Sequence, residues 1–124
     1  MPTTVLVCDD EDVLRALVRA TLDGGDYAIV EARDGDEALA RALAERPDLI
    51  LLDMMMPGRS GLDVLAELRR DPELAKTPVI MLTARTQASD REAADRAGAN
   101  RYLAKPFSPL ELASLVEECL EGRP

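Results

Sequence analysis

The chain has 124 residues, the size of one domain, and 47% of them are hydrophobic, enough for a sizeable core. Its formal charge is −9, with 24 acidic against 15 basic residues. Phosphate backbones are bound by clustered Lys and Arg, so we expect no direct nucleic-acid binding by this segment. No apolar run reaches the roughly 18–20 residues of a membrane span, and the N-terminus lacks the basic region of a signal peptide, so we expect no membrane partner.

The two cysteines, Cys8 and Cys119, lie far apart, and the chain contains no His. This arrangement gives neither a zinc-binding pattern nor a disulfide framework. We therefore expect both as small buried hydrophobic residues and place the protein in the reducing environment of the cytoplasm.

Five short apolar runs alternate with amphipathic stretches along the chain and predict five strands. Three of them lack any alternation of polar and apolar residues, which is typical of strands buried on both faces of a parallel sheet. The predicted strands cover residues 5–8, 27–30, 49–52, 79–82 and 102–104.

Helices are predicted between these strands. The first has an apolar stripe and ends at Gly24 and Gly25, and capping residues mark the starts of three others. A fourth helix, within residues 86–97, has only alanines as inward residues, so we expect it to be the most mobile. The stripe of the first helix comprises Val13, Leu14, Leu17, Val18 and Leu22; the second carries Ala38, Leu39, Ala42 and Leu43; the capping residues are Asp34 with Glu37, Ser60, and Ser108 with Glu111. This alternation predicts a single doubly wound α/β domain over residues 1–124, with helices on both faces of a parallel sheet.

Polar residues stand at the carboxyl ends of four predicted strands. Asp9 and Asp10 follow the first strand, Asp53 follows the third, Thr83 the fourth and Lys105 the fifth. Each has an ordinary explanation by itself, such as acidic residues favoured at a helix N-terminus or a solvated strand end. Together they bring three carboxylates, a hydroxyl and an ammonium to the edge where open α/β sheets bind ligands.

The chemistry of this set favours a hard cation and a phosphoryl group. Carboxylates gathered without His or Cys repel one another unless a cation joins them, and oxygen ligands suit Mg²⁺. Lys105 is one of only two Lys beside thirteen Arg, which indicates that a compact point charge is preferred there over a forked guanidinium. A site of this kind lowers the charge barrier to phosphoryl transfer.

The chain resembles the receiver domain of two-component response regulators over essentially its whole length, from Val5 to Leu120. The resemblance rests on four motifs that occur in order, each at a strand end. They are Asp9-Asp10, the segment from Asp53 through Pro57 to Gly61, Thr83-Ala84, and Lys105-Pro106-Phe107. It implies a flavodoxin-like fold of five βα units, with strand order 2-1-3-4-5 and a cis bond between Lys105 and Pro106.

The resemblance also implies the mechanism of a phosphoryl-acceptor switch. Asp53 would be phosphorylated by a sensor histidine kinase or a phosphotransfer protein, with Lys105 and Thr83 contacting phosphoryl oxygens. Asp10, Asp53 and the backbone carbonyl of Met55 would bind Mg²⁺ directly, and Asp9 would act mainly through water. Such a domain catalyses its own phosphorylation and dephosphorylation but has no separate turnover substrate.

Output would follow from Tyr102, which would turn inward as Thr83 moves. That would remodel the face formed by the fourth helix, the fifth strand and the fifth helix, and so signal to a downstream protein or effector domain. Asn100 and Arg101 stand where dimerising receivers carry two acids, so that ion-paired dimer is not expected. Met55 and Arg85 are expected to flank the path of the hydrolytic water and to slow dephosphorylation.

Other classes of Mg²⁺ or phosphate chemistry fit the residues of this sequence less well. A phosphatase of the haloacid-dehalogenase type also uses a nucleophilic Asp, but it would require an acid two residues later, where Met55 stands. A flavin carrier would require a hydroxyl- and glycine-rich loop after the first strand, where this chain has acids. A dinucleotide-binding GxGxxG is absent from the sequence.

Overall fold

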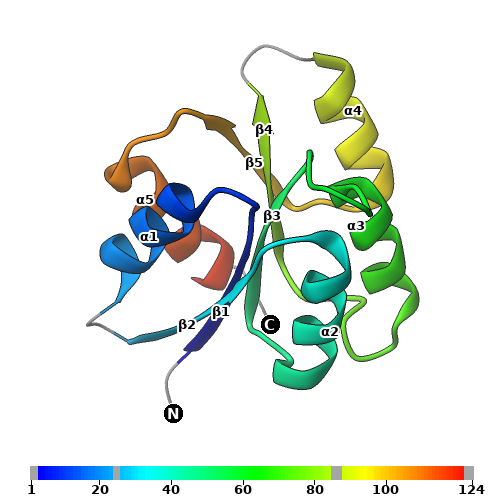
Figure 1. Ribbon diagram of the computed structural model, residues 1–124, viewed down its shortest axis with the longest axis horizontal. Coiled ribbons are helices and arrows are strands. Elements are labelled where there is room, and N and C mark those ends of the chain that lie inside the picture. The colour runs from blue at the N-terminus through cyan, green and yellow to red at the C-terminus, as the bar shows by residue number, and fades with distance from the viewer. Residues whose placement is uncertain (1–2, 24–25, 85–87, 122–124) are drawn as a thin grey trace.

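A five-stranded parallel sheet forms the centre of the computed structural model, which describes residues 3–23, 26–84 and 88–121 (Figure 1). The strands are β1 (Thr3–Cys8), β2 (Tyr27–Ala32), β3 (Leu49–Asp53), β4 (Val79–Ala84) and β5 (Arg101–Lys105). Their order across the sheet is β2-β1-β3-β4-β5, and every neighbouring pair is parallel. The predicted fold class and strand order are confirmed, and each predicted strand lies within an observed one.

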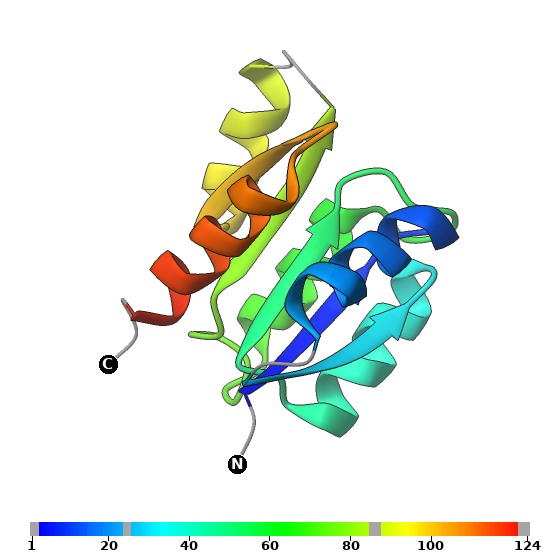
Figure 2. The same ribbon diagram turned by 90° about the vertical axis from the view of Figure 1, so that its left-hand side faces the viewer.

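Five helices cover the two faces of this sheet. They are α1 (Asp12–Leu22), α2 (Gly35–Glu45), α3 (Gly61–Arg70), α4 (Ala88–Ala97) and α5 (Pro109–Glu121). Helices α1 and α5 lie on one face, which is turned toward the viewer in Figure 2, while α2, α3 and α4 cover the other face (Figure 1). No helix in the described part of the chain is long and apolar enough to cross a membrane.

The predicted capping residues start their helices as expected. The Asp34 carboxylate accepts a hydrogen bond from the Glu37 N–H at 2.8 Å. Ser108 Oγ accepts from the Glu111 N–H at 3.1 Å, and the Glu111 carboxylate accepts from the Ser108 N–H at 3.0 Å, which completes a capping box. Ser60 Oγ caps α3 by accepting from the Asp63 N–H at 3.2 Å. The Gly24-Gly25 end predicted for the first helix lies outside the described residues.

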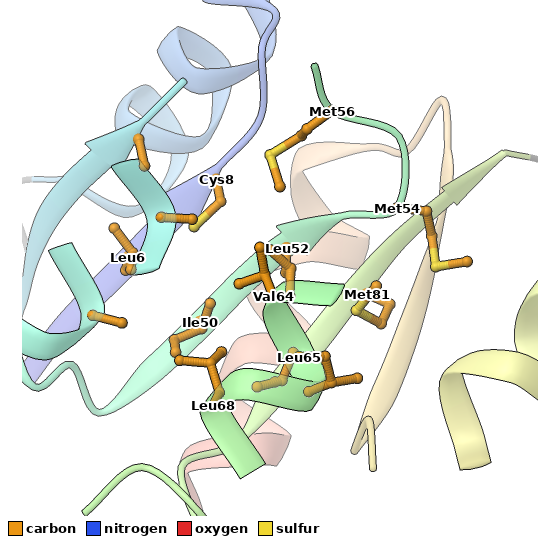
Figure 3. Close-up of a cluster of buried hydrophobic side chains, with 14 of the residues drawn as sticks. Leu6, Cys8, Ile50, Leu52, Met54, Met56, Val64, Leu65, Leu68 and Met81 are labelled. Atoms are coloured by element: carbon orange, nitrogen blue, oxygen red, sulfur yellow. The ribbon is translucent and has the colours of Figure 1, made fainter. Parts of the chain in front are cut away.

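Two apolar clusters, one on each face of the sheet, form the core. The cluster beneath α2 and α3 contains Leu6, Ile50 and Leu52 from the strands and Leu65 and Leu68 from α3 (Figure 3). All five residues of β3 are buried, because helices cover both of its faces. The central strand is therefore enclosed up to its last residue, Asp53.

Both cysteines are buried and free, as predicted, and burial raises the pKa of the Cys8 thiol.

Two apolar residues assigned to helix stripes are exposed, contrary to the prediction: Val13 by 81% and Leu43 by 53%. Val13 precedes the buried Arg15 by two residues, which is about 200° around an α-helix, so it faces solvent. Ala94 of α4 is fully buried, in line with the expected alanine face, while the mobility of α4 stays a prediction.

Candidate functional site

The acidic residues predicted to meet at the carboxyl edge of the sheet do so. Oxygen atoms of the Asp9, Asp10 and Asp53 carboxylates all lie within 4.8 Å of one another. Asp9 and Asp10 follow β1, and Asp53 is the last residue of the adjacent strand β3, so parallel pairing of the two strands brings them together. Three carboxylates at this spacing form a set of oxygen ligands suited to a hard divalent cation.

Asp9 and Asp53 are buried, whereas Asp10 is exposed. Asp9 Oδ1 accepts a hydrogen bond from the Glu11 N–H at 2.8 Å. Asp9 Oδ2 is paired with the Lys105 ammonium, 2.7 Å away. Burying a carboxylate is costly unless it is paired, so the fold depends on this contact.

Asp53 is the acid whose burial, contacts and pKa most clearly indicate a functional carboxylate. It is 4% exposed; its Oδ1 accepts from the Met55 N–H at 3.3 Å, and its Oδ2 lies 3.3 Å from Lys105 Nζ. Burial, and then the charge of Asp9, raise the pKa of Asp53 to about 6, although Lys105 opposes the rise. A buried carboxylate with such a shift beside a second acid is a typical candidate for a reactive group.

Lys105 joins these acids from the end of β5. Besides Asp9 and Asp53, its Nζ lies 3.3 Å from the exposed carboxylate of Glu11. Burial alone lowers the pKa of Lys105, but the hydrogen bond with Asp9 and the charges of Asp53 and Asp9 outweigh it, so the pKa is raised. The peptide bond between Lys105 and Pro106 is cis, which confirms that prediction.

Gly61 allows the β3–α3 loop to close over the end of β3. Its N–H donates to the Met54 carbonyl at 3.0 Å, and a Cβ at this position would lie 2.1 Å from the Asp53 carbonyl oxygen. Only glycine fits such a close approach of backbone to backbone. The loop leaves Met54 buried but the side chain of Met55 77% exposed, beside the Asp53 carboxylate.

Thr83 lies on β4, the strand beside β3, and Tyr102 lies on β5, the next strand across the sheet. Thr83 is 2% exposed and lies one residue beyond Leu82, the residue of β4 that pairs with Asp53. Tyr102 on β5 is half-buried, and its hydroxyl donates a hydrogen bond to the Asp95 carboxylate on α4. Arg85, expected to flank the water path, lies outside the described residues.

A cleft of about 700 Å³ opens at the acidic cluster. Its lining includes the charged residues Asp10, Asp53 and Lys105. It also includes apolar side chains of α1 and of the segment before α5, such as Leu14, Leu17 and Phe107. The cleft therefore combines charged groups with an apolar wall.

Arg15 is a residue at this site that sequence reasoning missed. It lies on α1, is 6% exposed, and its Nη1 donates to the Asp9 carbonyl oxygen at 2.7 Å. Its spacing to Val18 and Leu22, three and seven residues later, places it within the apolar stripe. A charged residue at a stripe position is the signal that could have indicated its burial.

Comparisons with known proteins agree with this geometry. The family model for the response regulator receiver domain matches residues 5–117. The chain is 46% identical over 118 residues to the transcriptional regulatory protein ResD of Bacillus subtilis, covering 95% of this chain and 48% of that protein. It thus spans about half the length of the curated relatives it matches.

Solved structures give the same result. The chemotaxis protein CheY4 of Vibrio cholerae superimposes with a TM-score of 0.91 at 33% identity, covering 97% of this chain and all of that one. The receiver domain of the sensor histidine kinase PA1611 of Pseudomonas aeruginosa has a TM-score of 0.89 at 31% identity, covering 98% of this chain and 100% of its own. That structure holds a magnesium ion coordinated in its active site cleft.

None of these comparisons supports a phosphatase of the haloacid-dehalogenase type. The acidic cluster at the carboxyl edge, the strand order and the family match instead lead to one assignment. The chain belongs to the response regulator receiver domain family and is a phosphorylation-dependent signalling switch.

Proposed function

We propose that Asp53 is the phosphoryl acceptor of this switch and that the donor is a phosphohistidine of a sensor histidine kinase or a phosphotransfer protein. One observation carries the proposal: a buried carboxylate with a raised pKa lies beside a second acid, and one ammonium contacts both. In the transfer, an Asp53 oxygen bonds to phosphorus as the bond from phosphorus to the histidine nitrogen breaks. The nitrogen keeps the electron pair of that bond.

The proposed metal ligands are the carboxylates of Asp10 and Asp53 and the backbone carbonyl of Met55, with Asp9 acting mainly through water. The oxygen-only donor set fits Mg²⁺, and the PA1611 receiver provides a precedent in the same family. When bound, Mg²⁺ supplies positive charge that offsets the charge developing on the transferred phosphoryl group. Asp9 is already paired with Lys105, which supports its indirect role.

Lys105 and Thr83 are proposed to contact the phosphoryl oxygens. The Lys105 ammonium already lies 3.3 Å from Asp53 Oδ2, so it can donate to an oxygen of a group attached to that carboxylate. Thr83 is buried at the end of the neighbouring strand and offers a hydroxyl donor. Both act by orienting and neutralising the group, which is where catalysis of phosphoryl transfer mainly lies.

Tyr102 is the proposed switch residue, and its change would remodel the surface of α4, β5 and α5 for a downstream protein or effector domain. The histidine-bearing partner would approach over the apolar wall of the cleft beside Asp53. We propose that this segment neither binds nucleic acid itself nor turns over a separate substrate. The charge of −9 supports the first of these statements.

Treatment with acetyl phosphate and Mg²⁺, followed by intact-mass analysis, tests the acceptor assignment. One phosphoryl addition is expected in the wild type and none in Asp53→Asn. Asp63→Asn, an exposed acid on α3, serves as the control and should be labelled like the wild type. An undiminished adduct in Asp53→Asn would refute the assignment, and multiple turnover of the donor without a stable adduct would indicate an enzyme instead.

A further inference from the structure

We infer that Arg15 is a positioning residue that fixes the peptide between Asp9 and Asp10 and thereby arranges both carboxylates for the divalent cation. The inference rests on the metal site proposed above. It concerns a residue that lies outside the acceptor, the ligands and the switch, and that acts through the backbone.

The Arg15 guanidinium is almost fully buried, and its three nitrogens all donate. Nη1 donates to the Asp9 carbonyl oxygen at 2.7 Å, Nε donates to Glu31 Oε1 at 3.0 Å, and Nη2 pairs with the Asp12 carboxylate. Glu31 lies on β2, the strand beside β1. The guanidinium therefore connects the loop between β1 and α1, which carries Asp9 and Asp10, to a neighbouring strand of the sheet.

The Asp9 carbonyl belongs to the planar peptide group that joins Asp9 to Asp10. The N–H on the other side of Asp9 donates to the Ala32 carbonyl at 3.1 Å, so the backbone at Asp9 is held at both ends. Asp10 has an exposed side chain, whose direction depends on the peptide from which it starts. Without Arg15 that peptide would lose its side-chain anchor, and the Asp10 carboxylate would sample more orientations.

Arg19 provides a matched comparison one turn further along α1. Its Nε and Nη2 lie 2.9 and 2.8 Å from Glu31 Oε2, and Nη2 also donates to the Ile29 carbonyl at 3.2 Å. Arg19 thus shares the acidic partner of Arg15, but the backbone carbonyl to which it donates is that of Ile29 and not that of Asp9. Arg15→Met and Arg19→Met each remove one positive charge and one partner of Glu31, and only Arg15→Met releases the Asp9 carbonyl.

In Arg15→Met, the loss of the positive charge and the loss of the hydrogen bond to Asp9 predict opposite changes in Mg²⁺ affinity. Loss of a positive charge near the acids strengthens cation binding by electrostatics, because Glu31 and Asp12 lose their counter-charge. Loss of the anchor weakens binding, because the ligands must be ordered when the cation binds. Removing groups that orient metal ligands typically costs about 10–100-fold in affinity, so we expect the loss of the anchor to outweigh the charge effect.

Isothermal titration calorimetry with Mg²⁺, on the wild type, Arg15→Met and Arg19→Met, tests the inference. We expect Kd to rise at least about tenfold in Arg15→Met and to stay within about twofold in Arg19→Met. Labelling by acetyl phosphate should then require more Mg²⁺ in Arg15→Met but reach a maximal rate close to that of the wild type. A general structural role would lower the melting temperature of both variants without separating their Mg²⁺ affinities.

Equal or tighter Mg²⁺ binding in Arg15→Met would overturn the inference. If that variant does not fold, Arg15→Lys takes its place, because a single ammonium cannot span Asp9 and Glu31 together; its Kd should rise several-fold, and an unchanged Kd would overturn the inference. Absence of Mg²⁺ binding by the wild type would refute the proposed metal site together with this inference. Wild-type binding with equal values for the two Met variants would refute the role of Arg15 alone.

Discussion

Lys105 Nζ lies 2.7 Å from Asp9 Oδ2, so this ammonium pairs most closely with the most buried member of the acidic cluster. The same ammonium lies 3.3 Å from Asp53 Oδ2. The Lys105 ammonium therefore offsets part of the negative charge of Asp9 and Asp53. Its contact with Asp53 also places the ammonium within reach of an oxygen of a phosphoryl group added to that residue.

Lys105→Met and Lys105→Arg should separate the charge of Lys105 from its shape. Lys105→Met leaves the buried Asp9 without its counter-charge, and breaking such a pair costs about 3 kcal/mol or more, measurable by urea unfolding without Mg²⁺. Lys105→Arg should keep most of this stability because the charge remains. Its fork cannot easily place a point charge against one phosphoryl oxygen, so switching should still fail.

The switching of these variants can be followed through Tyr102, in a background in which Tyr27, the other tyrosine of the chain, is replaced by Phe. Phosphorylation with acetyl phosphate should change Tyr102 fluorescence when Lys105 is present. The change should be reduced or absent in Lys105→Arg. A full response in Lys105→Arg would show that charge alone is sufficient.

Mg²⁺ should stabilise the fold through the acidic cluster. A ligand that binds only the native state adds about 2.7 kcal/mol at a hundredfold excess over its Kd. Asp10→Ala should slightly raise the melting temperature without Mg²⁺, because it removes one of three mutually repelling carboxylates, and it should abolish the Mg²⁺ response. Differential scanning calorimetry with and without millimolar Mg²⁺ measures both effects. An unchanged wild-type melting temperature would contradict the metal site.

Glu31 should contribute stability that depends on pH. The hydrogen bond with Arg19 comes first among the causes that lower its pKa; burial opposes it, and the bond with Arg15 adds to the lowering. A lowered folded-state pKa means stability that is present above the unfolded-state pKa and is lost as pH falls through the folded-state value. Because Glu31 is partly exposed, solvent screening limits the contribution to about 1 kcal/mol.

The measurement compares the free energy of unfolding of the wild type and Glu31→Gln in urea at several pH values. The wild type should be more stable at pH 7, and the difference should shrink as pH falls below about 4, where free Glu titrates. Glu45→Gln, a change at an exposed acid on α2, controls for general titration. A difference that does not change with pH would show that Glu31 acts without its charge.

The lifetime of the phosphorylated state should depend on Met55 and Arg85. Met55 is exposed beside Asp53 and cannot orient water by hydrogen bonding, so we predict slow self-dephosphorylation. The double variant Met55→Asn with Arg85→Glu supplies polar groups that can position a water. Its phosphoryl group should be lost several-fold faster, a barrier change of about 1 kcal/mol, as measured by the decay of the intact-mass adduct. Equal decay rates would show that these positions do not control the lifetime.

Local patterns determined much of this protein from the sequence alone. Unbroken apolar runs such as residues 49–52 predicted buried parallel strands, and Ser108 with Glu111 predicted a helix start, because both signals depend on neighbouring residues only. Polar residues placed at strand ends predicted the site, since parallel strands bring their carboxyl ends to one edge.

Tertiary structure decided what depends on contacts between distant segments. The sequence does not show that Lys105 lies closest to Asp9, or that Arg15 turns into the protein while Val13 faces solvent. These outcomes depend on the rotation of α1 against the sheet and on which carboxylate loses its water. Burial raises the pKa of Asp53 to about 6 for the same reason, because desolvation exists only once the helices have closed over the strands.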